Sequence, residues 1–173
     1  TIHPDIRDVV LTLAAKQGDE TTFEKQWALY INSDSEEEKL RFLRAMAHIN
    51  DPTLLNEYLR RSLTSDVRIH NTIGMVISAA SNPLGKQLAW QFLKTNWEEF
   101  DHRYGKGGFG LMRLVSICSH FNSQEKANEV DSFFAEHPAP AAERTIRQAL
   151  ERGRLNIKWL EQNRQELSDW LTQ

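Results

Sequence analysis

The sequence predicts an all-α protein in which antiparallel helix pairs form a curved solenoid of the HEAT or armadillo kind. Three observations support this prediction. Apolar residues recur at helical spacing, capping residues precede many of these stretches, and no turn with alternating polarity supplies strands with partners. Helix, short turn and helix repeat along the chain, and units of ~40 residues of this type build α-solenoids. The units cannot be aligned with one another by residue identity, so the prediction of a solenoid depends on the regular alternation of helices and short turns. A globular helical bundle is the structural alternative.

Six helices are predicted for the first half of the chain. Ser35 opens a capping box in which its oxygen accepts a backbone N–H while Glu38 reaches back. Asp51 and Asn82 each precede a proline at a first helical position, and Gly18 fits a helix end. The apolar stripes include Phe23, Trp27 and either Tyr30 or Ile31; Leu54, Leu55, Tyr58 and Leu59; and Leu84, Leu88 and Phe92. The predicted helices span roughly residues 4–17, 20–32, 36–49, 52–63, 66–80 and 83–95.

The second half continues the same pattern. Gly105 and Gly153 fit helix ends, and Pro138 and Pro140 forbid one helix through that segment. Residues 76–77 and 114–117 resemble buried strands in composition, yet they lack partner strands and are assigned to helices. The predicted helices span roughly residues 97–104, 108–120, 123–136, 141–152 and 155–171, with one of the set merging into a neighbour. The apolar stripes place Trp97 and Trp170 in the core, and the tryptophans in general largely inside.

Length and composition predict one domain over residues 1–173. With 173 residues and 40% hydrophobic content, the chain can bury a substantial core. The net charge of −3 argues against a surface for nucleic acid or an anionic membrane. No stretch approaches the roughly 18 apolar residues of a membrane span, and no signal sequence opens the chain. The single cysteine, Cys118, excludes an intrachain disulfide and is predicted to be a buried small hydrophobe. Together with the lack of a glycosylation acceptor, this favours a cytoplasmic location.

Ordered segments spread over the whole chain resemble one known domain. They are Asn96–Phe100 leading to Tyr104–Phe109, His137–Ile146, His3–Arg7, Asn82–Gly85, Ala89–Phe92, Trp159-Leu160 and Trp170-Leu171. The chain resembles the C-terminal helical domain of gluzincin-type zinc aminopeptidases, most closely the puromycin-sensitive branch. That domain is a curved array of helix pairs, so the resemblance agrees with the predicted fold. Residues 82–85 are more similar to other branches of the family.

The resemblance implies a non-catalytic role. In the family the C-terminal domain caps the catalytic domain, encloses the peptide cavity and influences substrate access. Its partners would be the catalytic domain of the same parent chain and the peptide substrate, with no nucleic acid and no membrane contact. The chain has neither His-Glu-x-x-His nor Gly-x-Met-Glu-Asn, so no catalytic or metal-binding residue is assigned and zinc is expected only in the catalytic domain of the parent. The first residue, Thr1, fits a fragment. The competing interpretation is a free-standing helical-repeat scaffold that binds proteins.

Two other motifs are weighed and set aside. Residues 105–110 satisfy G-x-G-x-x-G, but the preceding segment is predicted to be a helix rather than the strand that dinucleotide binding requires. Ser116, Cys118, Ser119 and His120 are close in sequence, but neighbours along a helix point in different directions. A glycine-rich link and a coincidence of composition are therefore the preferred interpretations.

Three residues are assigned to the candidate site through the resemblance. The segment after the glycines faces the catalytic cavity in the family, which implies that Lys106, Phe109 and Arg113 face the substrate cavity here. An arginine at this position could bind a peptide carboxylate or an acidic side chain through two parallel hydrogen bonds. An ordinary interface salt bridge of Arg113 is the alternative.

Overall fold

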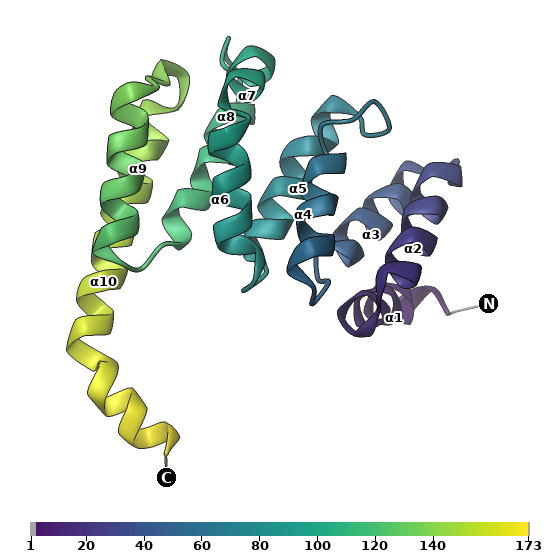
Figure 1. Ribbon diagram of the computed structural model, residues 1–173, viewed down its shortest axis with the longest axis horizontal. Helices are drawn as coiled ribbons and strands as arrows, with labels where there is room; N and C mark the ends of the chain where they lie inside the picture. The colour runs from purple at the N-terminus through teal and green to yellow at the C-terminus, as the bar shows by residue number, and fades with distance from the viewer. Residues whose placement is uncertain (1–2, 173) are drawn as a thin grey trace. The chain divides into compact units, whose positions relative to one another are not determined.

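The structure, a computed structural model, describes residues 3–172 and contains helices but no strand within that range. Ten α-helices and two short 3-10 helices follow one another along the described chain (Figure 1). The all-α prediction is confirmed, including the helical assignment of residues 76–77 and 114–117. Contacts divide the chain into two compact units, one up to Thr95 and one from Asn96 onward. The prediction of one domain over residues 1–173 stays a prediction.

The first unit consists of six helices joined by short connectors. They are α1 (Pro4–Gln17), α2 (Glu20–Asn32), α3 (Glu36–Met46), α4 (Pro52–Arg61), α5 (Ile69–Ser81) and α6 (Gly85–Thr95). Helices α2 and α3 pack against each other, as do α5 and α6, while α1 contacts α3 and α4 contacts α6. In Figure 1, α2 to α6 lie side by side. The core of this unit holds fully buried side chains such as Phe23, Tyr58 and Trp90.

The predicted caps are largely confirmed, with one correction at α3. The Asp51 carboxylate accepts hydrogen bonds from the backbone N–H groups of Thr53 and Leu54, as predicted. Ser35 Oγ accepts from the backbone N–H of Glu38 at 3.4 Å. The reciprocal contact predicted for Glu38 is wrong, because the N–H of Ser35 donates to Ser33 Oγ instead.

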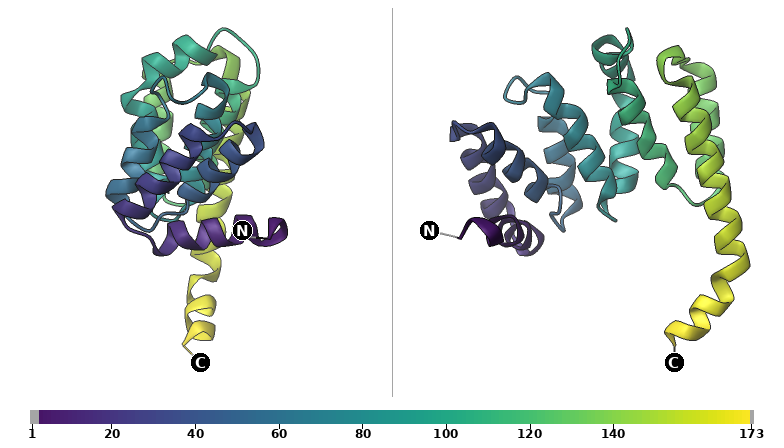
Figure 2. Two further views of the ribbon diagram at one scale, coloured as in Figure 1. Left: turned by 90° about the vertical axis from the view of Figure 1, so that its right-hand side faces the viewer. Right: turned by 180° about the vertical axis from the view of Figure 1, so that it is seen from behind.

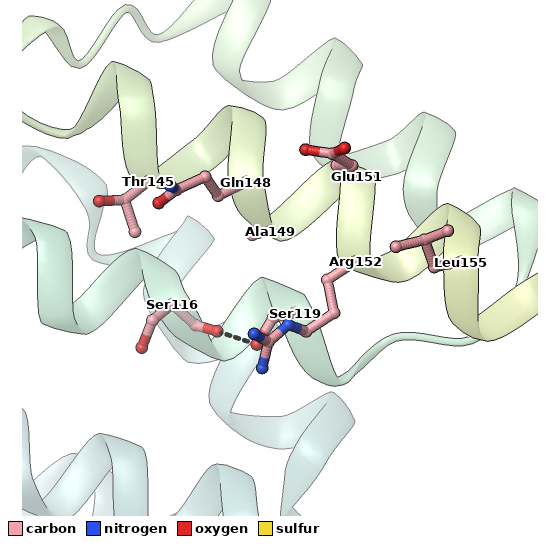
Figure 3. A pocket seen from close by; sticks show the side chains of 8 residues that line it. All are labelled: Ser116, Ser119, Thr145, Gln148, Ala149, Glu151, Arg152 and Leu155. Carbon is pink, nitrogen blue, oxygen red and sulfur yellow. Dashed lines mark hydrogen bonds between the residues drawn. The ribbon is translucent and has the colours of Figure 1, made fainter.

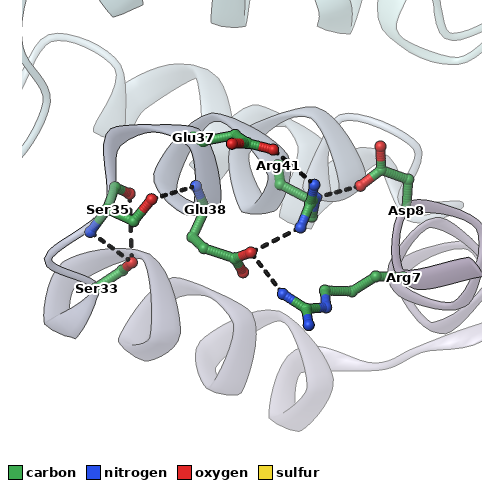
Figure 4. A network of polar contacts seen from close by, with 7 residues as sticks. All are labelled: Arg7, Asp8, Ser33, Ser35, Glu37, Glu38 and Arg41. Atoms are coloured by element: carbon green, nitrogen blue, oxygen red, sulfur yellow. Dashed lines mark hydrogen bonds and ion pairs between the residues drawn. The ribbon is translucent and has the colours of Figure 1, made fainter. Parts of the chain in front are cut away.

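The Glu38 carboxylate instead joins an ion-pair network between α1 and α3 (Figure 4). Its Oε1 accepts from Arg7 Nη1 at 2.7 Å and from Arg41 Nη1 at 2.6 Å. Arg41 also pairs with Asp8 of α1 and with Glu37 of its own helix. Because the Arg41 side chain is only 16% exposed, the network anchors α1 more firmly than isolated surface pairs would.

A second network joins α2 to α4 through Arg61. Its guanidinium pairs with Glu24 of α2 at 2.5 Å and with Glu57 of α4 at 2.7 Å. It also lies about 5 Å from the ring centroids of Phe23 and Trp27, a distance at which cation–π attraction contributes. Hydrogen bonds from Arg60, and then from Arg61, lower the pKa of Glu57 from its ordinary 4.5 to about 2.

We expect Glu57 to make the chain sensitive to acid. Because its pKa is lower in the folded state, its contribution is present above pH 4.5 and is lost as the pH falls toward 2. Glu57→Gln should lower the free energy of unfolding at pH 7 by about 1–2 kcal/mol, after allowance for solvent screening, and should make its decline between those pH values shallower. Urea titrations at a series of pH values test this.

The control variant is Glu136→Gln, because the exposed Glu136 carboxylate has no ion-pair partner among residues 3–172. It should leave the acid dependence unchanged. Equal acid dependence of Glu57→Gln and the wild-type chain would show that the pairs with Arg60 and Arg61 do not stabilise the fold.

Asn82 connects two turns of the first unit rather than only starting a helix. Helix α6 begins at Gly85, two residues later than predicted, and Asn82 Oδ1 accepts from the backbone N–H of Leu84 at 3.0 Å. The Nδ2 group donates to the carbonyl oxygens of Ala47 and Ile49, at 2.9 and 3.0 Å, after the end of α3. The side chain is 94% buried, so it satisfies three backbone groups where water is excluded.

The second unit also consists of helices. They are α7 (Trp97–Tyr104), α8 (Gly110–Val115), the 3-10 helix η1 (Ser116–His120), α9 (Gln124–Glu136), the 3-10 helix η2 (Pro140–Ala142) and α10 (Glu143–Leu171). The single helix predicted over residues 108–120 is thus divided into α8 and η1. The break at Pro138 and Pro140 is confirmed, and the two predicted C-terminal helices merge into α10.

The prediction that Gly153 ends a helix is wrong, because this residue lies inside α10. It is buried where α10 packs on η1, and a β-carbon at this position would lie 3.5 Å from the carbonyl oxygen of Phe121. A glycine inside a helix costs up to about 1 kcal/mol relative to alanine. The packing of α10 on η1 outweighs this local preference.

The tryptophans divide into buried and exposed sets. Trp97 is 6% exposed and meets the rings of Phe133 and Phe134 edge to face, as predicted for a core residue. The burial predicted for Trp170 is wrong, since this side chain is 70% exposed, and Trp159 is 53% exposed. The reason is visible in Figures 1 and 2, where the last turns of α10 extend beyond α9.

Two further predictions concern Cys118 and membrane-spanning helices. Cys118 is buried, as predicted, and burial raises the pKa of its thiol, which keeps the thiol protonated. Among residues 3–172, no helix combines the length and the apolar character needed to cross a bilayer.

Candidate functional site

A glycine-rich turn leads from α7 to the predicted site residues. The N–H of Gly105 donates to the carbonyl oxygen of Asp101 at 2.7 Å and ends α7. Gly107 and Gly108 have φ angles of 126° and 86°, which glycine adopts without the strain of a side chain. A helix, not a strand, precedes this turn, so the structure lacks the strand that a dinucleotide-binding loop requires at this place.

Lys106, Phe109 and Arg113 are all exposed on the second unit. The Phe109 side chain is 78% exposed, and Phe109 stands directly before α8. The N–H of Arg113 donates to the carbonyl oxygen of Phe109 at 2.9 Å, so the two residues are one helical turn apart and share a face. Within residues 3–172 the Arg113 guanidinium has no ion-pair or hydrogen-bond partner. Their role in a substrate cavity stays a prediction.

A polar pocket of about 430 Å³ lies one turn further along, between η1 and α10 (Figure 3). Ser116 Oγ donates to the carbonyl oxygen of Arg113 at 2.6 Å, which connects the pocket wall to the predicted site. Ser119 Oγ donates to the carbonyl oxygen of Ser116 at 2.7 Å. The remaining lining residues come from α10, and they are Thr145, Gln148, Ala149, Glu151, Arg152 and Leu155.

Arg152 is the cation of this pocket. In Figure 3 its side chain extends from α10 toward Ser119 of η1, whereas Glu151 points away from η1. As for Arg113, no partner of the Arg152 guanidinium occurs in the described part of the chain. A free guanidinium beside hydroxyl groups provides donors for a carboxylate, and the serine oxygens remain available as acceptors.

The pocket does not have the groups of a hydrolytic centre. The protons of Ser116 and Ser119 are donated to backbone carbonyl oxygens, and the nearby Cys118 thiol is buried. Over residues 3–172, no group of three His, Cys, Asp or Glu side chains is placed to hold a metal ion. The Arg152 guanidinium and the hydroxyl oxygens of the pocket are groups that can bind a polar or anionic segment.

Sequence reasoning found one side of this surface and missed the other. Thr145, Gln148 and Arg152 share one face of α10, which their spacing shows. Nothing local indicates that this face packs beside η1. That neighbourhood joins residues about thirty positions apart and is decided by the packing of the second unit.

Comparisons with known proteins agree with the resemblance stated above. The model of the ERAP1-like C-terminal domain family matches residues 1–155. The chain is 32% identical to aminopeptidase N of Mus musculus over 178 residues, which cover 100% of the chain and 18% of that protein. It is 33% identical to aminopeptidase M1 of Arabidopsis thaliana over 176 residues, which cover 99% of the chain and 20% of that protein. The chain thus spans about a fifth of the length of these curated relatives. It belongs to the ERAP1-like C-terminal domain family.

Proposed function

We propose that the chain is the non-catalytic C-terminal domain of a zinc-dependent aminopeptidase. It would cap the catalytic domain, enclose the peptide cavity and influence substrate access. The observation that carries this proposal is that the whole chain is similar to part of proteins named as aminopeptidases. The matching part makes up about a fifth of the length of each of them. The parent would remove N-terminal residues from peptides with zinc-activated water, and zinc would be bound by residues outside this chain.

The exposed polar surface of the second unit supports a role in peptide binding. Arg113 offers a planar guanidinium that can bind a carboxylate through two parallel hydrogen bonds. Phe109, on the same face, offers an apolar ring to a neighbouring side chain of the peptide, and Lys106 adds a positive charge at the glycine-rich turn. Arg152 extends this positively charged surface to the pocket between η1 and α10. None of these groups takes part in bond cleavage in this proposal.

We expect Arg113→Ala, made in the full-length parent enzyme, to change peptide selectivity without loss of stability. The guanidinium has no partner within residues 3–172, so its removal should change the melting temperature of the domain by less than about 2 °C. Relative kcat/KM for peptides with acidic residues should fall about 10-fold against neutral peptides of the same length. Competition assays with matched peptide pairs measure this ratio.

Arg144→Ala is the matched control, because Arg144 is also an exposed arginine of the second unit but does not line the pocket. It should leave the ratio unchanged. If Arg113→Ala destabilises the domain by several kcal/mol while selectivity is unaltered, Arg113 is a structural ion-pair residue and the site assignment is wrong.

Three finer statements belong to the same proposal. The parent would act in the cytoplasm, which the single cysteine supports. The helices would form a HEAT-like array, and the enzyme would belong to the puromycin-sensitive branch. The parent reading frame distinguishes the aminopeptidase domain from the alternative, a free-standing scaffold. A His-Glu-x-x-His sequence upstream of Thr1 supports the aminopeptidase, and a start codon directly before Thr1 supports the scaffold.

A further inference from the structure

The second unit has a further pocket, which is mostly apolar and lies between the end of α9 and the start of α10. Its volume is about 390 Å³, at the lower end of the range that small-molecule sites occupy. Phe134, Ile146 and Leu150 line it and are 8%, 9% and 9% exposed, so the pocket opens onto the edge of the core. Ala135 and Pro138 add further apolar surface. We call this cavity the α9–α10 pocket.

The link between the two helices is restrained by hydrogen bonding, by ring stacking and by its prolines. The N–H of His137 donates to the carbonyl oxygen of Phe133 at 2.9 Å, and the two rings stack with centroids 4.3 Å apart. Pro138 and Pro140 both line the pocket, and each fixes one φ angle of the link. The walls are therefore largely formed before a ligand arrives, which lowers the entropic cost of binding.

An unpaired carboxylate lies at the edge of the pocket. Asp131 of α9 is exposed and lines the pocket, and within residues 3–172 its carboxylate has no ion-pair or hydrogen-bond partner. Glu143 and Arg147 of α10 also line the pocket, but they pair with each other at 2.9 Å. The negative charge of Asp131 is thus left without compensation. A free carboxylate beside an apolar cavity complements a ligand that carries a positive charge.

We propose that the α9–α10 pocket binds a small organic cation that combines an ammonium group with an apolar body. The apolar body is buried against Phe134, Ile146 and Leu150, and the ammonium group donates to the carboxylate of Asp131. An anionic ligand is disfavoured by the same carboxylate. A ligand that is polar throughout loses its water at the apolar wall without gaining new hydrogen bonds. This inference goes beyond the proposed function, which uses other residues of the second unit.

Nuclear magnetic resonance titrations of the 173-residue chain with three probes of similar size test the proposal. The probes are the cation phenethylammonium, the neutral phenethyl alcohol and the anion phenylacetate. The cation should bind with a Kd of about 1 mM, as expected for so small a ligand, and should shift amide signals of α9 and α10 but not of α2. The alcohol should bind about 5-fold more weakly, phenylacetate should bind more weakly still, and added salt should reduce these differences.

Two pairs of variants separate the roles of charge and cavity. Asp131→Asn should give the cation the affinity of the alcohol, whereas Glu136→Gln, at a free carboxylate of α9 that does not line the pocket, should change nothing. Ala135→Leu fills part of the pocket and should weaken the cation and the alcohol at least about 10-fold. Ser132→Leu, at an exposed residue of α9 outside the pocket, is its control. All four variants should keep the helical circular dichroism of the wild-type chain.

Four results would overturn the proposal. They are a cation that does not bind saturably, equal affinities of the cation and the alcohol for the wild-type chain, a preference for the cation that survives Asp131→Asn, and signal shifts that lie away from α9 and α10. Each of these results would leave the role in the parent enzyme untouched, because that role is tested by peptide selectivity.

Discussion

Replacing Trp97 with alanine should lower the free energy of unfolding by about 3–5 kcal/mol, which is the usual cost of truncating a large buried aromatic side chain. The ring is 6% exposed and packs against both Phe133 and Phe134, with ring centroids 5.6 and 5.4 Å away. Alanine would remove both edge-to-face contacts and leave a cavity at the start of α7. Urea denaturation followed by circular dichroism measures the loss.

Trp170→Ala is the matched comparison, because it removes the same side chain from a site that is 70% exposed. It should cost less than about 1 kcal/mol. Similar losses for the two variants would mean that the last turns of α10 pack against the chain in solution. A loss below about 1 kcal/mol for Trp97→Ala would show that α7 is not packed on α9.

Replacing Asn82 with aspartate should lower the free energy of unfolding by about 2–4 kcal/mol at pH 7. The change keeps the oxygen that accepts from Leu84 but removes the Nδ2 group that donates to Ala47 and Ile49. It also places a carboxylate next to two carbonyl oxygens at a site that is 94% buried. Both effects act in the same direction, and thermal or urea unfolding of the chain measures their sum.

The pH dependence of the Asn82→Asp variant provides a second readout. The introduced carboxyl is harder to ionise in the folded chain than in the unfolded one, so part of the lost stability should return as the pH falls toward about 4 and protonation restores a donor. Ser81→Ala, at the neighbouring exposed residue, should change stability by no more than about 0.5 kcal/mol. A loss below about 0.5 kcal/mol for Asn82→Asp would show that the two turns do not depend on this amide.

Helix positions were predictable because their signals are local. The cap at Asp51 and the break at Pro138 depend on residues that are neighbours in sequence, and both are found where predicted. The exceptions are places where a distant contact outweighs the local signal. Gly153 continues α10 because it packs beside η1, and Glu38 leaves the cap of α3 because it pairs with Arg7 of α1.

The candidate site was only half predictable. The exposure of Phe109 and Arg113 agrees with their assignment to a surface, which came from the resemblance rather than from periodicity. Arg152 was not predicted, because its place beside Ser119 arises only when α10 packs on η1. A lone arginine on a predicted helix is normally a solvated residue, so no sequence signal separated it from its neighbours.

The sequence by itself determined the all-α class, the approximate bounds of most helices and the family, because periodicity, caps and ordered motifs are all encoded in neighbouring residues. Only the tertiary structure decided which apolar stripes are covered. Trp97 and Trp170 lie on similar stripes, yet Phe133 and Phe134 of α9 pack against Trp97, whereas Trp170 lies at the end of α10 and is 70% exposed. Burial depends on the surface that a distant segment supplies, and the spacing of residues within one helix contains no information about that segment.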